Sequence, residues 1–116
     1  MIVTSGLSAH WAMEVRERLS ARGLDVAVLH VGRFAPPPQE LTDHIQAARR
    51  WYVVEDHMRH GGLADMAARV AGRQPDLWFG WPENWTGGSG TSDELRRSCG
   101  LDGQTIANAI WKASAT

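Results

Sequence analysis

The sequence predicts a three-layer α/β/α sandwich, in which a mostly parallel sheet lies between helices on both faces. Two observations support this fold class. Short apolar segments alternate along the chain with segments of helical periodicity, and glycine- or proline-containing turns separate them. The apolar segments are almost continuous, which is typical of strands buried on both faces of a parallel sheet. Strands and helices in such alternation predict helices packed on both sides of one sheet.

The first two elements are a strand and a helix. The segment MIVTSG (1–6) predicts a short strand that ends in glycine. Ser8 is the expected N-cap of a helix over about 9–21, because its hydroxyl can accept from the free N–H groups of the first turn. Gly23 then supplies the left-handed residue that ends the helix. The buried side of this helix is expected to consist of Trp11, Ala12, Val15 and Leu19.

The next elements continue the alternation. DVAVLHVG (25–32) predicts the second strand. RFAPPPQE (33–40) is a rigid connection, because consecutive prolines lack the N–H groups that a sheet or helix interior needs. A helix through about 39–49 and the strand WYVVE (51–55) follow. The prolines therefore separate the second strand from the second helix.

The second half predicts one more strand and three helices. A helix over about 62–71 precedes the strand DLWFGW (76–81) and the glycine-rich loop WPENWTGGSGTS (81–92). Ser92 is the expected cap of a short helix, and the last helix spans about 103–113. The chain has no internal repeat and no low-complexity segment, so residues 1–116 are expected to form one domain.

The composition limits the class of protein. With 116 residues, 43% hydrophobic and 22% charged, the chain is expected to be globular with a single core. A net charge of −1 gives no electrostatic reason to expect nucleic acid or an anionic membrane as a partner. Cys99 is the only cysteine, so no internal disulfide can form. No signal peptide and no membrane-spanning stretch are evident, and we expect a cytoplasmic protein.

Tryptophan is unusually frequent, with six against one tyrosine and two phenylalanines. Trp78, Trp81 and Trp85 fall close together. Tryptophan is enriched at protein interfaces, where its ring is buried while its N–H binds a polar group. The cluster therefore either covers the edge of the domain's own core or contacts another chain.

Residues that could act in catalysis or binding are most frequent around the third predicted strand. Glu55, Asp56, His57 and His60 precede the pair Gly61–Gly62. Polar residues at the carboxyl end of a strand, followed by glycines and a helix, are where α/β enzymes often build a site. The segment has neither H-E-x-x-H nor a Cys/His metal spacing, and the chain has no G-x-S-x-G elbow. A metal site or a Ser/His/Asp assembly is therefore disfavoured, and no reaction is specified.

A second candidate lies near the first helix. Ser5, Gly6 and Ser8 stand at its start, where backbone N–H groups can hold a phosphate. GLSAHW is not G-x-G-x-x-G, and a P-loop lysine is missing, so a role in the turn and cap is favoured. A free-standing small-ligand or regulatory module, with a site near Ser5, Gly6 and His57, remains the alternative hypothesis.

Three stretches resemble the transketolase C-terminal domain, over about residues 2–111. The opening (2–38) has the same order of strand, glycine turn, helix, Gly-Leu-x-Val strand and proline turn. The stretch 53–70 has a Val-rich strand ending in acidic-acidic-His, then Gly-Gly and a helix. The ending (80–110) has a glycine-rich loop, Gly-Leu-Asp and Ile-Ala-x-Ala-Ile. The same domain type closes deoxyxylulose-phosphate synthases and the β subunits of 2-oxo acid dehydrogenases, and Glu-Asp-His favours transketolase.

The resemblance implies a role in assembly. In transketolase-like enzymes, thiamine diphosphate and magnesium lie between the two preceding domains, which bind the pyrophosphate and the pyrimidine. The C-terminal domain holds neither the cofactor ligands nor the catalytic base, so no catalytic, cofactor-binding or metal-binding residue is expected here. The residues expected at a partner interface are Glu55, Asp56, His57, Gly61, Gly62, Trp11, Trp81 and Trp85.

A whole transketolase is several times longer than this chain. The chain is therefore expected to be either a separately encoded subunit of a split transketolase or an excised domain. As a subunit, it would join separate polypeptides that carry the pyrophosphate- and pyrimidine-binding domains, in a hetero-oligomer with two-fold symmetry. The assembly would transfer a two-carbon ketol unit between sugar phosphates.

Overall fold

A single parallel sheet forms the middle layer of the protein. The computed structural model describes residues 1–83 and 90–115. The strands are β1 (Ile2–Thr4), β2 (Val28–His30), β3 (Tyr52–Met58) and β4 (Leu77–Trp81). Their order in the sheet is β2-β1-β3-β4, and each pairing is parallel. The predicted parallel sheet is confirmed.

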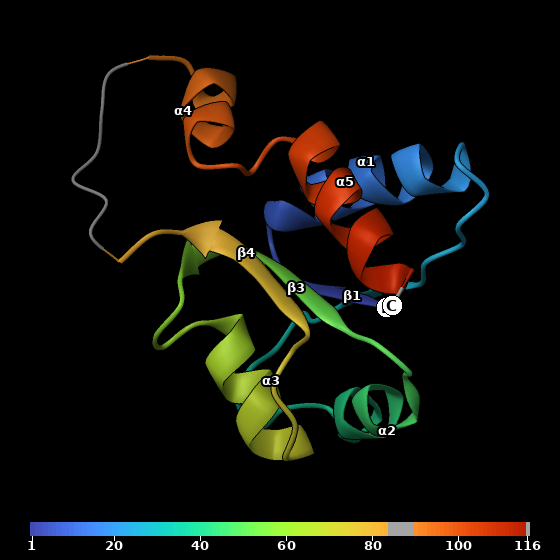
Figure 1. Cartoon of the computed structure of the whole chain (residues 1–116). Helices are drawn as coiled ribbons and strands as arrows, with labels where there is room; N and C mark the ends of the chain where they lie inside the picture. Colours follow the sequence, from blue (N-terminus) through green and yellow to red (C-terminus); the bar gives the residue numbers. More distant parts are fainter. Residues whose placement is uncertain (84–89, 116) are drawn as a thin grey trace.

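Helices cover both faces of this sheet. They are α1 (Ser8–Ser20), α2 (Gln39–Ala47), α3 (Leu63–Ala71), α4 (Ser92–Ser98) and α5 (Gly103–Ser114). Figure 1 shows α1 and α5 on one face and α2 and α3 on the other, with α4 to one side. The predicted three-layer α/β/α sandwich is therefore confirmed. Within the part of the chain that the structure describes, no helix is long and apolar enough to cross a membrane.

The sheet separates two clusters of buried side chains. Val3 and Val53 pack toward α2 and α3. Their neighbours Ile2 and Val54 pack toward α1 and α5. Successive residues of a strand point to opposite faces, so each central strand supplies both core layers. This is why the apolar segments are continuous in the sequence.

Two of the predicted helix caps are wrong. Leu7, rather than Ser8, is the N-cap residue of α1, and it makes no side-chain cap bond. The hydroxyl of Ser8 is turned into the domain, where it donates to the Ser5 carbonyl oxygen at 2.5 Å. The cap of α4 is Thr91 instead of Ser92. Only Thr91 has a glutamate three residues later, Glu94, with which it forms a reciprocal capping box.

The third strand is longer than predicted. It continues past Glu55 through Asp56 and His57 to Met58, so Asp56 and His57 lie within the strand rather than after it. The continuation is paired with β4, although the register shifts before Met58. Burial changes along this continuation of the strand. Glu55 is buried, whereas Asp56, His57 and Met58 are exposed. Pairing with β4 therefore extends the strand past its apolar part.

Candidate functional site

The order of the strands creates a crevice at the carboxyl edge of the sheet. From β1 the chain moves outward to β2, and it then crosses back to β3 and β4. In doubly wound sheets, ligands bind outside the carboxyl ends of the strands where the connections diverge. A cavity of about 260 Å³ lies at this place. This carboxyl-edge crevice is lined by Ser5, Gly6, Leu7, Phe34, Glu55, Asp56, His57, Gly61, Gly62 and Leu63.

Glu55 supports the crevice from inside the domain. It is 1% exposed, and its carboxylate accepts from the N–H groups of Leu63 and Ala64 at 2.8 and 3.1 Å. It also accepts from Nε1 of Trp78 at 2.7 Å. The N-cap residue of α3, Gly62, has no side chain that could satisfy the first turn. The carboxylate of Glu55 therefore caps α3 and is used within the domain rather than presented to a partner.

The glycine pair allows α3 to lie this close to β3. Gly61 has a φ of 77°, a left-handed conformation that side chains rarely adopt. A Cβ atom on Gly62 would overlap Oε1 of Glu55 and would lie 2.8 Å from Nδ1 of His57. The spacing of E-D-H-x-x-x-G-G thus has a structural cause, since the glutamate carboxylate fills the space above the second glycine.

Asp56 and His57 face outward beside the buried glutamate. Asp56 accepts from Nε1 of Trp81 at 2.6 Å. Nδ1 of His57 lies 2.6 Å from the Met58 carbonyl oxygen and must donate to it, because a carbonyl can only accept. In a neutral His57 ring, Nε2 is then the acceptor nitrogen. This pair can offer hydrogen bonds to a partner.

Hydrogen bonds to two carboxylates fix the turn between β3 and α3. Asp65 accepts from the Gly61 N–H at 2.6 Å and from Arg59 at 2.7 Å, and the first of these bonds chiefly lowers its pKa. Glu83 accepts from both the backbone N–H and Nδ1 of His60, at 3.1 and 2.7 Å, and its pKa is lowered chiefly by the backbone bond. The turn is therefore attached to α3 and to the end of β4.

Two of the predicted interface tryptophans meet at this edge. The rings of Trp11 and Trp81 form an edge-on contact, with centroids 6.3 Å apart and planes at 85°. The guanidinium of Arg96, from α4, lies over the Trp11 ring at 4.4 Å from its centroid. Both rings are half-buried, although Trp11 was expected on the buried side of its helix. The third predicted tryptophan, Trp85, lies outside the described residues.

Large apolar side chains that no sequence motif singles out are exposed around the crevice. Leu7 is 71% exposed, Phe34 39% and Met58 44%. Each lies at or just beyond the carboxyl end of a strand. The other exposed large hydrophobic residue among those the structure describes is Met13, on α1. Interface cores are apolar, rich in aromatic residues and methionine, and have polar rims. This edge has the composition of a protein contact surface.

A metal ion has little to bind at the crevice. Among residues 1–83 and 90–115, no group of three or more His, Cys, Asp or Glu residues could hold one. Glu55 and His57 are both engaged in the hydrogen bonds given above.

The fold and this edge define a class of protein, a doubly wound α/β domain with exposed apolar side chains at the carboxyl ends of its strands. The family model for the transketolase C-terminal domain matches residues 1–106. The chain therefore belongs to the transketolase C-terminal domain family, and the resemblance inferred from its motifs is confirmed.

Individual relatives agree with this assignment. Transketolase-like protein 2 of Homo sapiens is 30% identical over 80 residues, which are 66% of this chain and 12% of that protein. A Methanocaldococcus jannaschii protein, whose name describes a transketolase C-terminal section, is 30% identical over 115 residues, or 96% of this chain and 35% of that protein. A solved split gene transketolase, described as an inactive β4 tetramer, has a TM-score of 0.77 and 25% identity, over 97% of this chain and 38% of that one. The chain thus spans well under half the length of each.

Proposed function

We propose that the chain is the non-catalytic C-terminal part of a thiamine diphosphate-dependent transketolase. In this proposal, its carboxyl edge docks onto the polypeptides that carry the pyrophosphate- and pyrimidine-binding domains. The complete enzyme transfers a two-carbon ketol unit between sugar phosphates. The observation that carries the proposal is the exposure of Leu7, Phe34 and Met58 together at the edge that also holds Trp11 and Trp81.

The relatives support the need for a partner. The chain covers 38% of the split gene transketolase chain and 35% of the archaeal relative, so most of each has no counterpart here. Our proposal assigns thiamine diphosphate and magnesium to that missing portion. The hydrogen bonds of Glu55 and His57 within the domain fit a role in shaping the edge.

Reconstitution tests this function. The chain is produced alone and together with polypeptides that carry the other two domains. We expect ketol transfer only from the mixture, and no calorimetric heat when thiamine diphosphate and magnesium are added to the isolated chain. Full activity of the partner polypeptides without this chain would contradict the proposal, as would micromolar binding of the cofactor by the chain alone.

Trp81→Ala is expected to weaken this assembly by about 2 kcal/mol or more, because a half-buried tryptophan among apolar neighbours is typical of an interface anchor. Trp111→Ala is the matched control. Trp111 is also partly buried, but it lies on α5 and stacks with Arg22, whose guanidinium is 4.2 Å from its ring centroid. Titration calorimetry with the partner measures both affinities, and circular dichroism verifies folding. Equal affinities of the two variants would rule out the carboxyl edge as the contact.

The alternative hypothesis can be tested at the same crevice. Ser5, Gly6 and His57 do line one cavity, as a free-standing small-ligand or regulatory module requires. A ligand that raises the melting temperature of the isolated chain, and loses this effect in His57→Ala, would favour that function over the transketolase role.

A further inference from the structure

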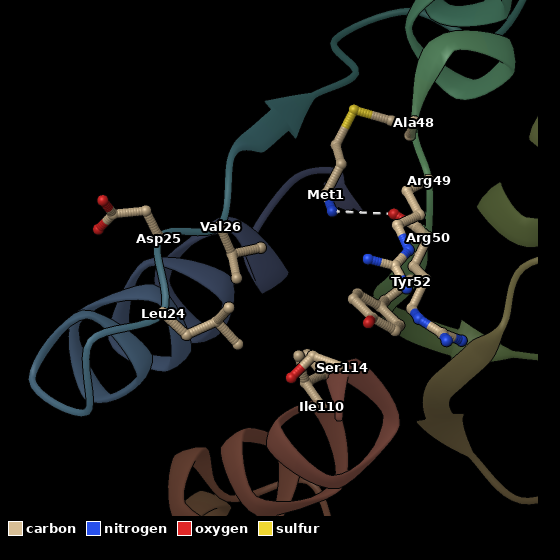
Figure 2. A pocket seen from close by; sticks show the side chains of 10 residues that line it. All are labelled: Met1, Leu24, Asp25, Val26, Ala48, Arg49, Arg50, Tyr52, Ile110 and Ser114. Carbon is tan, nitrogen blue, oxygen red and sulfur yellow. Dashed lines mark hydrogen bonds between the residues drawn. The ribbon is translucent and has the colours of Figure 1, made fainter. Parts of the chain in front are cut away.

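A second cavity lies at the opposite, amino-terminal edge of the sheet. Its volume is about 400 Å³, which is within the range of small-molecule sites. Figure 2 shows that it is lined by the start of β1, the segment that leads into β2, the segment that leads into β3 and the last turns of α5. Its apolar wall consists of Met1, Leu24, Val26, Ala48 and Ile110. None of these residues belongs to the carboxyl-edge crevice.

Tyr52 lines this cavity and presents a polar group to it. The residue is 3% exposed and packs in the core cluster beneath α1 and α5. Within residues 1–83 and 90–115 its hydroxyl makes no hydrogen bond, and its oxygen is not among the atoms sealed from solvent, so it is open to the cavity. Figure 2 shows the phenolic oxygen turned into the cavity, on the side of α5. The hydroxyl of Ser114, nearby, already donates to the Trp111 carbonyl oxygen at 2.8 Å.

Two arginines, Arg49 and Arg50, line the cavity against the single lining carboxylate of Asp25, and this balance favours an acidic ligand. The guanidinium of Arg49, which is exposed, has no ion pair or hydrogen bond within the described part of the chain. The carboxylate of Asp25 points away from the other lining residues in Figure 2. The Met1 amine donates to the Arg50 carbonyl oxygen at 3.1 Å, drawn as a dashed line in Figure 2. Burial lowers the pKa of this amine and raises the pKa of Tyr52, as expected of groups shielded from water.

We propose that this cavity binds a small carboxylic acid with an apolar body. The carboxylate accepts the hydrogen bond of the Tyr52 hydroxyl and pairs with Arg49. The apolar body lies against Leu24, Val26 and Ile110. A neutral ligand would leave Arg49 unpaired, and a cation would be repelled by it. The site is on the edge opposite the proposed docking surface, so the proposal does not depend on the transketolase assignment.

The tyrosine itself provides the readout, because it is the only one in the chain. Isotope labelling of tyrosine gives ring signals from this residue alone, which can be followed by NMR while isocaproate is added to the full chain. We expect a saturable shift with a dissociation constant on the order of 1 mM. Isocaproamide has nearly the same shape without the charge, and it is expected to bind about tenfold more weakly. No saturable shift up to about 50 mM isocaproate would overturn the proposal, as would equal binding of the acid and the amide.

Variants test the two polar contacts separately. Tyr52→Phe removes the hydroxyl and keeps the buried ring, and Arg49→Gln changes only an exposed side chain. Each is expected to weaken isocaproate binding about tenfold, followed at the Ile110 amide. Arg69→Gln, an equally exposed arginine on α3, is the control and should leave binding unchanged. Unchanged affinity in Tyr52→Phe would overturn the proposed geometry, and Arg49→Gln keeps the test valid if the core variant fails to fold.

Discussion

Glu55→Ala is expected to lower the free energy of unfolding by about 3 kcal/mol or more, because it leaves several buried donors without an acceptor. These donors are the N–H groups of Leu63 and Ala64 and Nε1 of Trp78. The loss includes the negative charge at the N-terminus of α3, where the helix dipole favours an anion. Urea denaturation followed by circular dichroism measures the change.

Asp56→Ala is the matched control for this prediction. Asp56 is the next residue, it is exposed, and its hydrogen bond is made to the half-buried Trp81. Its removal is expected to cost less than about 1 kcal/mol. Glu55→Gln should lie between the two, since the amide keeps one acceptor oxygen but directs an NH₂ group at donors. If Glu55→Ala costs no more than Asp56→Ala, Glu55 does not cap α3.

Gly62→Ala is expected to destabilise the domain by about 2 kcal/mol or more, as overpacking at a closely packed site does. The added Cβ atom overlaps Oε1 of Glu55, which cannot move without losing its bonds to α3. Backbone strain is not the cause, because the φ of Gly62 is −102°. Gly32→Ala is the control, since a Cβ atom there meets nothing within 4 Å. The denaturant midpoint of each variant gives the comparison.

A double-mutant cycle separates this overlap from other effects of the methyl group. With Glu55 already replaced by alanine, the space above Gly62 is open, and Gly62→Ala is expected to cost much less than in the native background. The coupling between the two positions should be about 1 kcal/mol or more. Additive effects would mean that the glutamate carboxylate does not require a glycine at position 62.

The fold was predictable because burial on both faces of the sheet leaves a direct mark on the sequence. Continuous apolar segments such as 51–54 can serve two core layers only as central strands. The caps were less predictable, because a hydroxyl at Ser8 can accept from its own helix or donate to a nearby carbonyl. Its side-chain direction, which tertiary packing sets, decides between these bonds.

The sequence pointed to residues that line the crevice, but it did not predict what each of their side chains does there. Glu55 directly follows the apolar residues of the strand. From the sequence alone, it could lie at the end of the strand, or it could lie inside the strand and point into the domain. Pairing with β4 extends the strand and places the glutamate inside. The exposure of Leu7, Phe34 and Met58 could not be predicted either, because apolar residues beside strands are usually buried. The open hydroxyl of Tyr52 depends on α5, which is distant in the sequence.

The bonds of Glu55 have a consequence for the kinetics of the proposed assembly. One carboxylate joins the first turn of α3, the strand β3 and the side chain of Trp78 in β4, so it holds these elements in one arrangement. A surface that is preorganised in this way loses little conformational entropy when a partner binds. The complex should therefore form without a slow rearrangement step. A substitution that loosens the carboxyl edge should weaken binding of the partner, even if the substituted residue does not contact the partner.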